Sequence, residues 1–142
     1  MRTVLSPRNI GVGVAIALLG FSGSTMAFAA TATGTSNPDL TVSVTVTPDQ
    51  LHVGDTATAT ESVTNNTSTD QTVTLANTLV TPKGRTYADA PQTITIAAGQ
   101  TVNVAPETYV ISRSDPRGTY ALTSSATDAN GTSSATTHYT IS

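Results

Sequence analysis

The 142-residue sequence contains no cysteine and no tryptophan, and few of its residues are aromatic or charged. Without cysteine the chain cannot be a disulfide scaffold, so packing alone has to stabilise it. Both methionines lie within the first 26 residues, and His52 and His138 are the only histidines. A soft copper site therefore lacks its usual ligands in the rest of the chain, and neither histidine has a partner at zinc-ligand spacing. We expect no metal and no other cofactor.

The first 29 residues have the order of a secretory signal peptide. Arg2 and Arg8 precede the apolar run IGVGVAIALLGF, and small residues follow at Ala27 and Ala29. The run is shorter than the roughly 20 residues that a membrane-spanning helix needs. We expect residues 1–29 to form a signal-peptide helix that is removed. The remaining chain is then secreted, and is extracellular or associated with the cell wall.

The chain after residue 29 is acidic, with four Lys and Arg residues against nine Asp and Glu residues. Nucleic acids and anionic lipids are bound by clustered Lys and Arg, and these four cations are scattered along the sequence. We therefore expect no nucleic-acid partner. The composition leaves the oligomeric state open.

Short runs of alternating residues occupy most of the sequence after a polar stretch at residues 30–38, which we expect to be a flexible lead-in. In LTVSVTVT the apolar residues face one side and the hydroxyl residues the other, and similar runs recur with turn residues between them. The expected strands cover residues 40–47, 56–65, 71–80, a short edge piece at Tyr87, and residues 92–96, 101–111, 119–128 and 132–141. Pro106 cannot donate to a sheet ladder, which predicts an edge position or a bulge there.

This pattern predicts an all-β fold with seven to eight strands over residues 39–142. Strands with one wet face and one packed face fit two antiparallel sheets stacked face to face, and the connections are too short for crossover helices. The small inward residues Ala57, Ala59, Ser124, Ala126 and Ala135 predict that the sheets approach closely.

The phrases LHVGDTATAT, TVTLANTLVTPKG, ITIAAGQTV and GTYALTSSATDANGTSSATTHYTI resemble bacterial extracellular immunoglobulin-like modules of the CARDB and fibronectin III-like kind. The resemblance implies an immunoglobulin-like sandwich. GTYAL also resembles the tyrosine corner of such domains, which implies that the Tyr120 hydroxyl bonds back to the backbone.

Glu61 and Asn77 break the alternation, because both fall where an apolar inward residue belongs. If residues 56–65 and 71–80 form a hairpin, Glu61 lies opposite Asn77, which suggests a shared hydrogen bond. Three interpretations stay open: a bulge near residue 60 that turns Glu61 outward, a buried polar contact that fixes sheet pairing, or a ligand or catalytic carboxylate.

No catalytic motif such as GxSxG or SxxK is present, so we do not expect an enzyme. The sequence instead favours a non-catalytic module that binds a protein or a cell-surface polymer through its loops. The loop SRSDPRG is the candidate interaction loop, because it places Arg113, Asp115 and Arg117 close together. The alternatives are a secreted protease inhibitor that presents an extended loop, and a hydrolase with a site around Glu61.

Overall fold

The computed structural model describes residues 28–142, and the regular structure in this part of the chain is β-strand. The strands are β1 (Ala30–Gly34), β2 (Leu40–Thr47), β3 (Gln50–Leu51), β4 (Thr56–Asn65), β5 (Gln71–Val80), β6 (Thr86–Ala88), β7 (Gln92–Ile96), β8 (Thr101–Val110), β9 (Gly118–Thr127) and β10 (Thr132–Ile141). The predicted signal-peptide helix lies outside the described residues, apart from Phe28 and Ala29. Residues 28–142 contain no helix long and apolar enough to cross a membrane.

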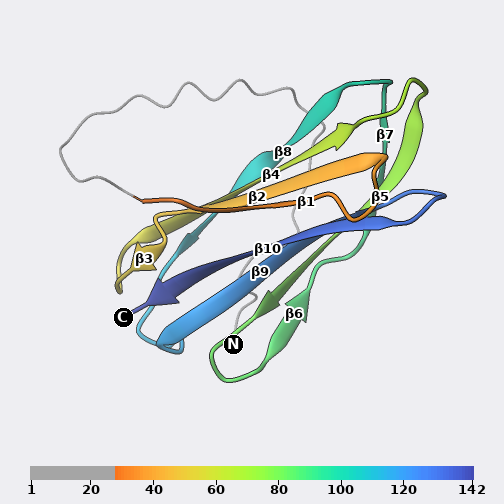
Figure 1. The fold of residues 1–142 in the computed structure, drawn as a ribbon. Coiled ribbons are helices and arrows are strands. Elements are labelled where there is room, and N and C mark those ends of the chain that lie inside the picture. Colours follow the sequence, from red (N-terminus) through yellow and green to blue (C-terminus); the bar gives the residue numbers. More distant parts are fainter. Residues whose placement is uncertain (1–27) are drawn as a thin grey trace.

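The strands form two stacked sheets, as the alternation predicts (Figure 1). One sheet has the order β1-β2-β4-β8, and the other has the order β3-β10-β9-β5-β6, with β7 also paired to β5. All pairings are antiparallel except that of β3 with β10, which is parallel. Residues 28–142 form ten strands instead of seven to eight, because the short strands β1 and β3 carry too little apolar alternation to be recognised in the sequence.

Residues 30–34, predicted to belong to a flexible lead-in, are instead strand β1. They pair with Val42–Val46 of β2 along their whole length. The segment continues into Asn37, which is buried and whose carboxamide donates to Asp128 Oδ1 at 2.9 Å and to the Gly131 carbonyl at 3.2 Å. The prediction was wrong because the inward residues of β1 are Ala and Gly, which are too small to produce a recognisable hydrophobic alternation. The same small residues allow the two sheets to approach closely.

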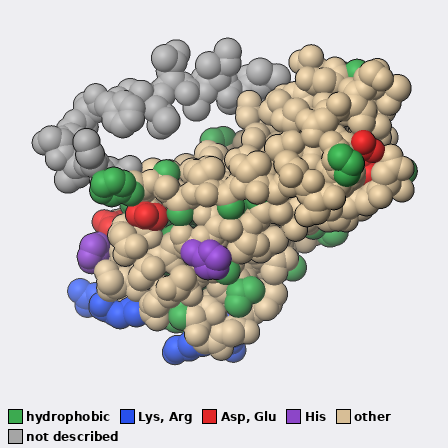
Figure 2. Space-filling model, in the orientation of Figure 1, with side chains coloured by type: hydrophobic (Ala, Val, Ile, Leu, Met, Phe, Trp, Pro, Cys, Tyr) green, Lys and Arg blue, Asp and Glu red, His purple; other side chains and the backbone are tan. Residues whose placement is uncertain are grey.

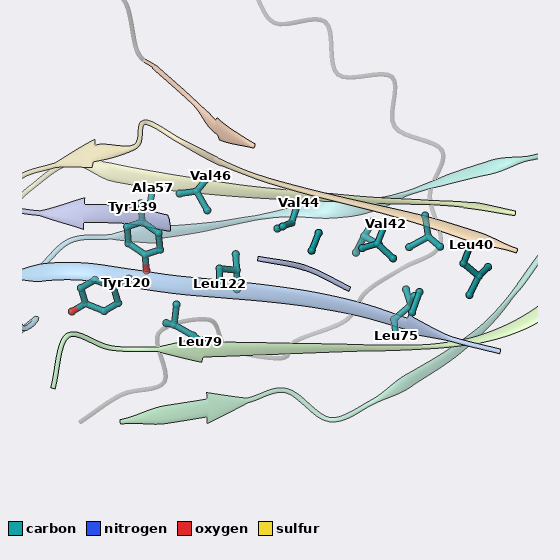
Figure 3. Packing of buried hydrophobic residues seen from close by; sticks show 14 of the residues in the cluster. Leu40, Val42, Val44, Val46, Ala57, Leu75, Leu79, Tyr120, Leu122 and Tyr139 are labelled. Atoms are coloured by element: carbon teal, nitrogen blue, oxygen red, sulfur yellow. The ribbon is translucent and has the colours of Figure 1, made fainter. Parts of the chain in front are cut away.

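The core lies between the two sheets and is built from alternate residues of each strand (Figure 3). In this view Val42, Val44 and Val46 of β2 project toward Leu75, Leu79 and Leu122 of the opposite sheet. Most of the core side chains are aliphatic and small or medium in size. The buried hydrophobic residues are Leu40, Val42, Val44, Val46, Leu51, Ala57, Val63, Val73, Leu75, Leu79, Ile96, Val104, Ile111, Tyr120, Leu122, Ala126, Ala135, Tyr139 and Ile141.

The outward positions of both sheets carry rows of hydroxyl residues, and few charged side chains are visible on the face shown in Figure 2. Between β2 and β4, a Thr or Ser faces a Thr or Ser at four successive outward positions. Cross-strand hydroxyl pairs hydrogen-bond on both faces, for example Thr64 with Thr101 and Thr123 with Thr136, each at 2.7 Å. β-Branched Thr favours extended backbone and tolerates water, so this composition suits a strand with a wet face.

Gly34 of β1 lies directly against the backbone of β10 in the other sheet. A Cβ at this position would overlap the backbone carbonyl of Ser134 in β10. Gly34→Ala should therefore force β1 away from β10 and lower the free energy of unfolding by about 1–3 kcal/mol, as overpacking does elsewhere.

Urea unfolding measures this change. Thr33→Ala on the same strand is the control, because Thr33 is exposed and its loss should cost less than about 0.5 kcal/mol. Equal stability of Gly34→Ala and the parent protein would contradict the close packing of β1 on β10.

Candidate functional site

Glu61 and Asn77, the two residues that break the sequence pattern, meet in the interior of the sandwich. Glu61 lies on the inward side of β4 and its side chain is only 8 % exposed. Asn77 lies on β5, and its Nδ2 donates a hydrogen bond to Glu61 Oε2 at 3.2 Å. The structure thus contains the buried polar contact that was one of the three interpretations.

The geometry of this contact differs from the expected hairpin. β4 pairs with β2 and β8, whereas β5 pairs with β9, β6 and β7, so the two strands belong to different sheets. The bond therefore crosses the interior and links the sheets face to face, and it does not fix the pairing within one sheet. The expectation was wrong because the five residues that follow Asn65 do not make a tight hairpin. The buried Asn65 carboxamide donates to the carbonyls of Thr69, Ile96 and Ala97, which carries the chain across to the second sheet.

A β-bulge lies beside Glu61, but on the neighbouring strand. Ala59 of β4 pairs with Glu107 of β8, and Glu61 pairs with Val104, so β8 has one extra residue between these pairs. The bulge contains Pro106 and occurs on an edge strand, and both properties agree with the prediction for this proline. It does not turn Glu61 outward, so that interpretation was wrong.

A small pocket adjoins the Glu61–Asn77 contact. The centre of a water molecule can occupy about 20 Å³ of this pocket. The pocket therefore has room for one or two water-sized groups. The walls are mostly aliphatic, and the polar groups come from β4, β5, β8 and β9. The lining residues are Val44, Ala59, Thr60, Glu61, Asn77, Val104, Ala105, Glu107, Leu122 and Ser124.

Burial raises the pKa of Glu61 from 4.5 to about 7. The hydrogen bond from Asn77 opposes this increase, and the nearby carboxylates of Glu107 and Asp89 add to it. Burial also raises the pKa values of Asp89 and Glu107, and the charge of Asp89 contributes to the increase at Glu107. Three carboxyl groups therefore share one region in which ionisation is unfavourable, and no Lys, Arg or His lines the pocket.

Stability should depend on pH through Glu61. The folded protein holds this proton up to about pH 7, whereas the unfolded chain releases it near pH 4.5. The stabilisation is therefore complete below pH 4.5 and is lost as the pH rises through 7, with a total of up to about 3 kcal/mol. Glu61→Gln should remove this part of the pH dependence.

Urea unfolding of both proteins between pH 4.5 and 8.5 tests this expectation. The raised pKa values of Asp89 and Glu107 act in the same direction in both proteins, so the difference between the two curves isolates Glu61. Parallel curves would show that Glu61 titrates normally.

The candidate interaction loop is ordered around Asp115. The carboxylate of Asp115 accepts hydrogen bonds from the Tyr109 hydroxyl at 3.0 Å and from the Ser112 backbone N–H at 2.7 Å. Asp115 therefore holds the loop against β8, while Arg113 and Arg117 are exposed. Of the three predicted residues, Asp115 therefore has a structural role, and the two arginines are exposed cations.

The loop between β5 and β6 lies against this interaction loop and adds two more cations. A Cβ on Gly118 would come within 2.9 Å of Pro82 Cβ, so the two loops touch. Lys83 and Arg85 in the β5–β6 turn are both exposed. The face shown in Figure 2 has its Lys and Arg side chains at one end of the molecule. We call Lys83, Arg85, Arg113 and Arg117 the cationic end.

All Lys and Arg residues of the described chain belong to the cationic end. Asp49, Asp55 and Asp115 lie in loops at the same end of the strands. The loops at the opposite end contain Asp39, Asp70 and Asp128, and among the described residues they contain no Lys or Arg. The sequence suggested scattered cations, but the topology brings residues 83–85 and 113–117 together.

Tyr120 has the geometry of a tyrosine corner. Its hydroxyl donates to the Pro116 carbonyl at 2.8 Å, four residues upstream, and its ring stacks on Tyr139 at a centroid distance of 5.1 Å. Burial raises the pKa of Tyr120 to about 12, so the hydroxyl keeps its proton at neutral pH. Tyr120 thus connects β9 to the interaction loop and has a structural role.

Removal of this hydroxyl should loosen the interaction loop. We expect Tyr120→Phe to lower the free energy of unfolding by about 1 kcal/mol, the usual net contribution of one hydrogen bond. Tyr139→Phe is the matched control, because it removes a hydroxyl from the stacked partner ring, and it should cost less. Thermal unfolding measures both variants, and equal losses would contradict the corner.

The remaining polar candidates do not form a further site. His52 lies in a turn beside Asp55, and His138 lies on the outer face of β10. Asp128 Oδ1 accepts hydrogen bonds from the backbone N–H groups of Asn130 and Gly131, as in a turn. Within residues 28–142, no three His, Cys, Asp or Glu side chains are grouped so that they could hold a metal ion.

Sequence reasoning missed Ser124 and Glu107 as neighbours of Glu61. Ser124 fits the small inward pattern of its strand, and Glu107 follows the bulge, which changes the side of the strand on which it lies. The only signal in the sequence that could have identified Ser124 is that it is a polar residue at an inward position opposite Asn77. That signal can be read only when the pairing of β5 with β9 is known.

Comparisons with known proteins show the fold. The structure is similar to the CARDB domain of a Pyrococcus furiosus protein, solved in complex with di-metal ions, with a TM-score of 0.54, 17% identity, and coverage of 73% of this chain and 88% of that domain. This agrees with the resemblance seen in the sequence, and the chain has a β-sandwich fold like that of the CARDB domain. No protein-family model matches the sequence, and no curated protein matches it either.

Two further similarities involve small parts of larger chains. The alkylpurine DNA glycosylase AlkC of Pseudomonas fluorescens, bound to DNA containing an abasic-site analogue, matches with a TM-score of 0.52 and 12% identity over 68% of this chain and 28% of that one. A family 123 glycoside hydrolase of Clostridium perfringens matches with a TM-score of 0.44 and 14% identity over 66% of this chain and 22% of that one. In both cases the chain corresponds to about a quarter of the larger enzyme.

Proposed function

We propose that the chain is a non-catalytic, exported recognition module whose cationic end binds an anionic surface polymer or an anionic face of a protein. The observation that carries this proposal is the collection of all four Lys and Arg residues of the described chain on two touching loops. The four cations are exposed, whereas the three Asp residues at the same end are only partly exposed. Exposed charges attract partners of opposite charge and orient their approach.

The rest of the surface supports an end-on contact. The outward positions of the two sheets carry mostly hydroxyl residues, and the described strands contain no Lys or Arg, so these faces offer little attraction to an anionic partner. The opposite end, with Asp39, Asp70 and Asp128, would repel such a partner. The two histidines lie away from the Glu61 pocket, which favours a binding role over acid–base catalysis.

The protease-inhibitor alternative receives no comparable support. An inhibitory loop of that kind protrudes in an extended conformation. The longest connection between described strands, residues 111–117, is folded back on β8 through Asp115. An anionic partner therefore remains the function that the geometry favours.

Binding to a polyanion tests the proposal. The chain from residue 30 is passed over immobilised dextran sulfate and over cell envelopes of the producing organism at increasing salt concentration. We expect retention that salt weakens, and the double variant Arg113→Gln and Arg117→Gln should bind about fivefold more weakly, because each exposed ion pair contributes roughly 0.2–1 kcal/mol.

A control variant separates the cationic end from net charge. Asp39→Asn combined with Asp70→Asn makes the protein less acidic at the opposite end. If binding depends on the cationic end, this variant should bind nearly as the parent protein does. Equal binding by the parent and the Arg113 and Arg117 variant would refute the proposal.

A further inference from the structure

Three buried polar atoms near one another in the Glu61 pocket have no hydrogen-bond partner in the protein. They are Glu61 Oε1, Asn77 Oδ1 and Ser124 Oγ, which come from β4, β5 and β9. Glu61 is 8 % exposed and Ser124 is fully buried. A buried polar group without a partner is costly, and such groups are rare in native proteins. Three of them around one pocket indicate that the pocket is built to receive a group that donates hydrogen bonds.

Departures from the sequence pattern converge on this pocket. Glu61 and Asn77 replace apolar residues on two different strands, and the bulge at Pro106 displaces β8 beside them, with Ala105 in the pocket wall. Places where a sequence departs from its own local rules are frequently functional, and bulges commonly occur beside sites.

The chemistry of the pocket selects for a positively charged donor. Glu107 lines the pocket, and Asp89 lies close enough for its charge to act on both glutamates. The backbone N–H of Asp89 donates to the Asn77 carbonyl, which places this acid beside the pocket residues. The lining contains no Lys, Arg or His, so a cation in the pocket would meet no like charge there and would favour the ionised form of these carboxyl groups.

The number of acceptors matches one particular cation. A primary ammonium group has three N–H donors and no acceptor, and three unpartnered buried oxygens belong to residues that line the pocket. The aliphatic walls, which include Val44, Val104 and Leu122, suit the methylene stem that carries such a group. Calcium, in contrast, takes six to eight oxygen ligands, which this small pocket does not supply.

We propose that the pocket between β4, β5, β8 and β9 binds a primary ammonium group, which donates hydrogen bonds to Glu61, Asn77 and Ser124 while its alkyl stem lies against the aliphatic wall. The ammonium comes from a lysine side chain of a partner or from a free alkylamine. The inference is independent of the cationic end, because it concerns an acidic pocket in the middle of β4.

A titration with n-butylammonium at pH 8, followed by NMR, tests the proposal. We expect saturable shifts confined to residues of the pocket, with the Asn77 and Ser124 signals among them. Binding should weaken about tenfold or more in Glu61→Gln, which loses the charged acceptor, and less in Ser124→Ala, which loses a neutral one. Saturation should also lower the pKa of the Glu61 carboxyl, because the cation favours its ionised form.

Two matched ligands separate the proposed chemistry from general effects. Tetramethylammonium has the charge without N–H donors, and n-butanol has the stem without the charge, so neither should produce the shifts. A peptide with a single lysine and blocked ends distinguishes the source of the ammonium: tighter binding than that of n-butylammonium assigns the pocket to a protein partner, and weaker binding assigns it to a free amine.

The absence of saturable shifts with both amines would overturn the proposal. So would equal binding of n-butylammonium and tetramethylammonium, or binding that Glu61→Gln leaves unchanged. Both variants are first checked for folding by the dispersion of their amide spectra, and Ser124→Ala provides the test if Glu61→Gln does not fold.

Discussion

Close contact between the inner faces of two sheets is the constraint on which the rest of this structure depends. Stacked sheets are separated by about 10 Å, and here Val, Leu and Ile side chains fill most of that space, with small residues such as Ala126 and Ala135 between them. A carboxylate between the sheets is desolvated, because the side chains around it are mostly aliphatic. The sheet-to-sheet bond of Glu61 with Asn77, the adjacent pocket and the raised pKa of Glu61 all follow from this setting.

Much of the fold could be predicted from the alternation of the sequence, because a period of two fixes which side of each strand is buried. It identified the last hairpin, the edge piece at Tyr87, and the core positions Val42 and Leu75. The alternation does not specify which strands pair. The hydrogen bonds of the Asn65 carboxamide direct the chain into the sheet to which β5 belongs. The position of β1 depends on the close approach at Gly34 and on the hydrogen bonds of Asn37.

In the candidate sites, too, some residues could be recognised from the local sequence pattern, and others depend on which strands pair. Glu61 and Asn77 were recognisable as departures from the pattern, and the proline at 106 marked the bulge. Ser124 looked ordinary in the sequence, and its place beside Asn77 comes from the β5–β9 register. The cationic end was also unpredictable, because about thirty residues separate Lys83 from Arg113 and only the topology brings their loops into contact.

The link between Asn37 and the final hairpin has a consequence for how the chain acquires its structure during synthesis. Asn37, near the start of the described chain, finds its partners Asp128, Gly131 and Ser133 only after more than ninety further residues have been synthesised. A nascent chain therefore cannot bury this residue or complete the second sheet. Its β2 and β4 segments would leave the ribosome with Val42, Val44 and Val63 uncovered, and such a chain stays open to chaperones until β10 has been synthesised.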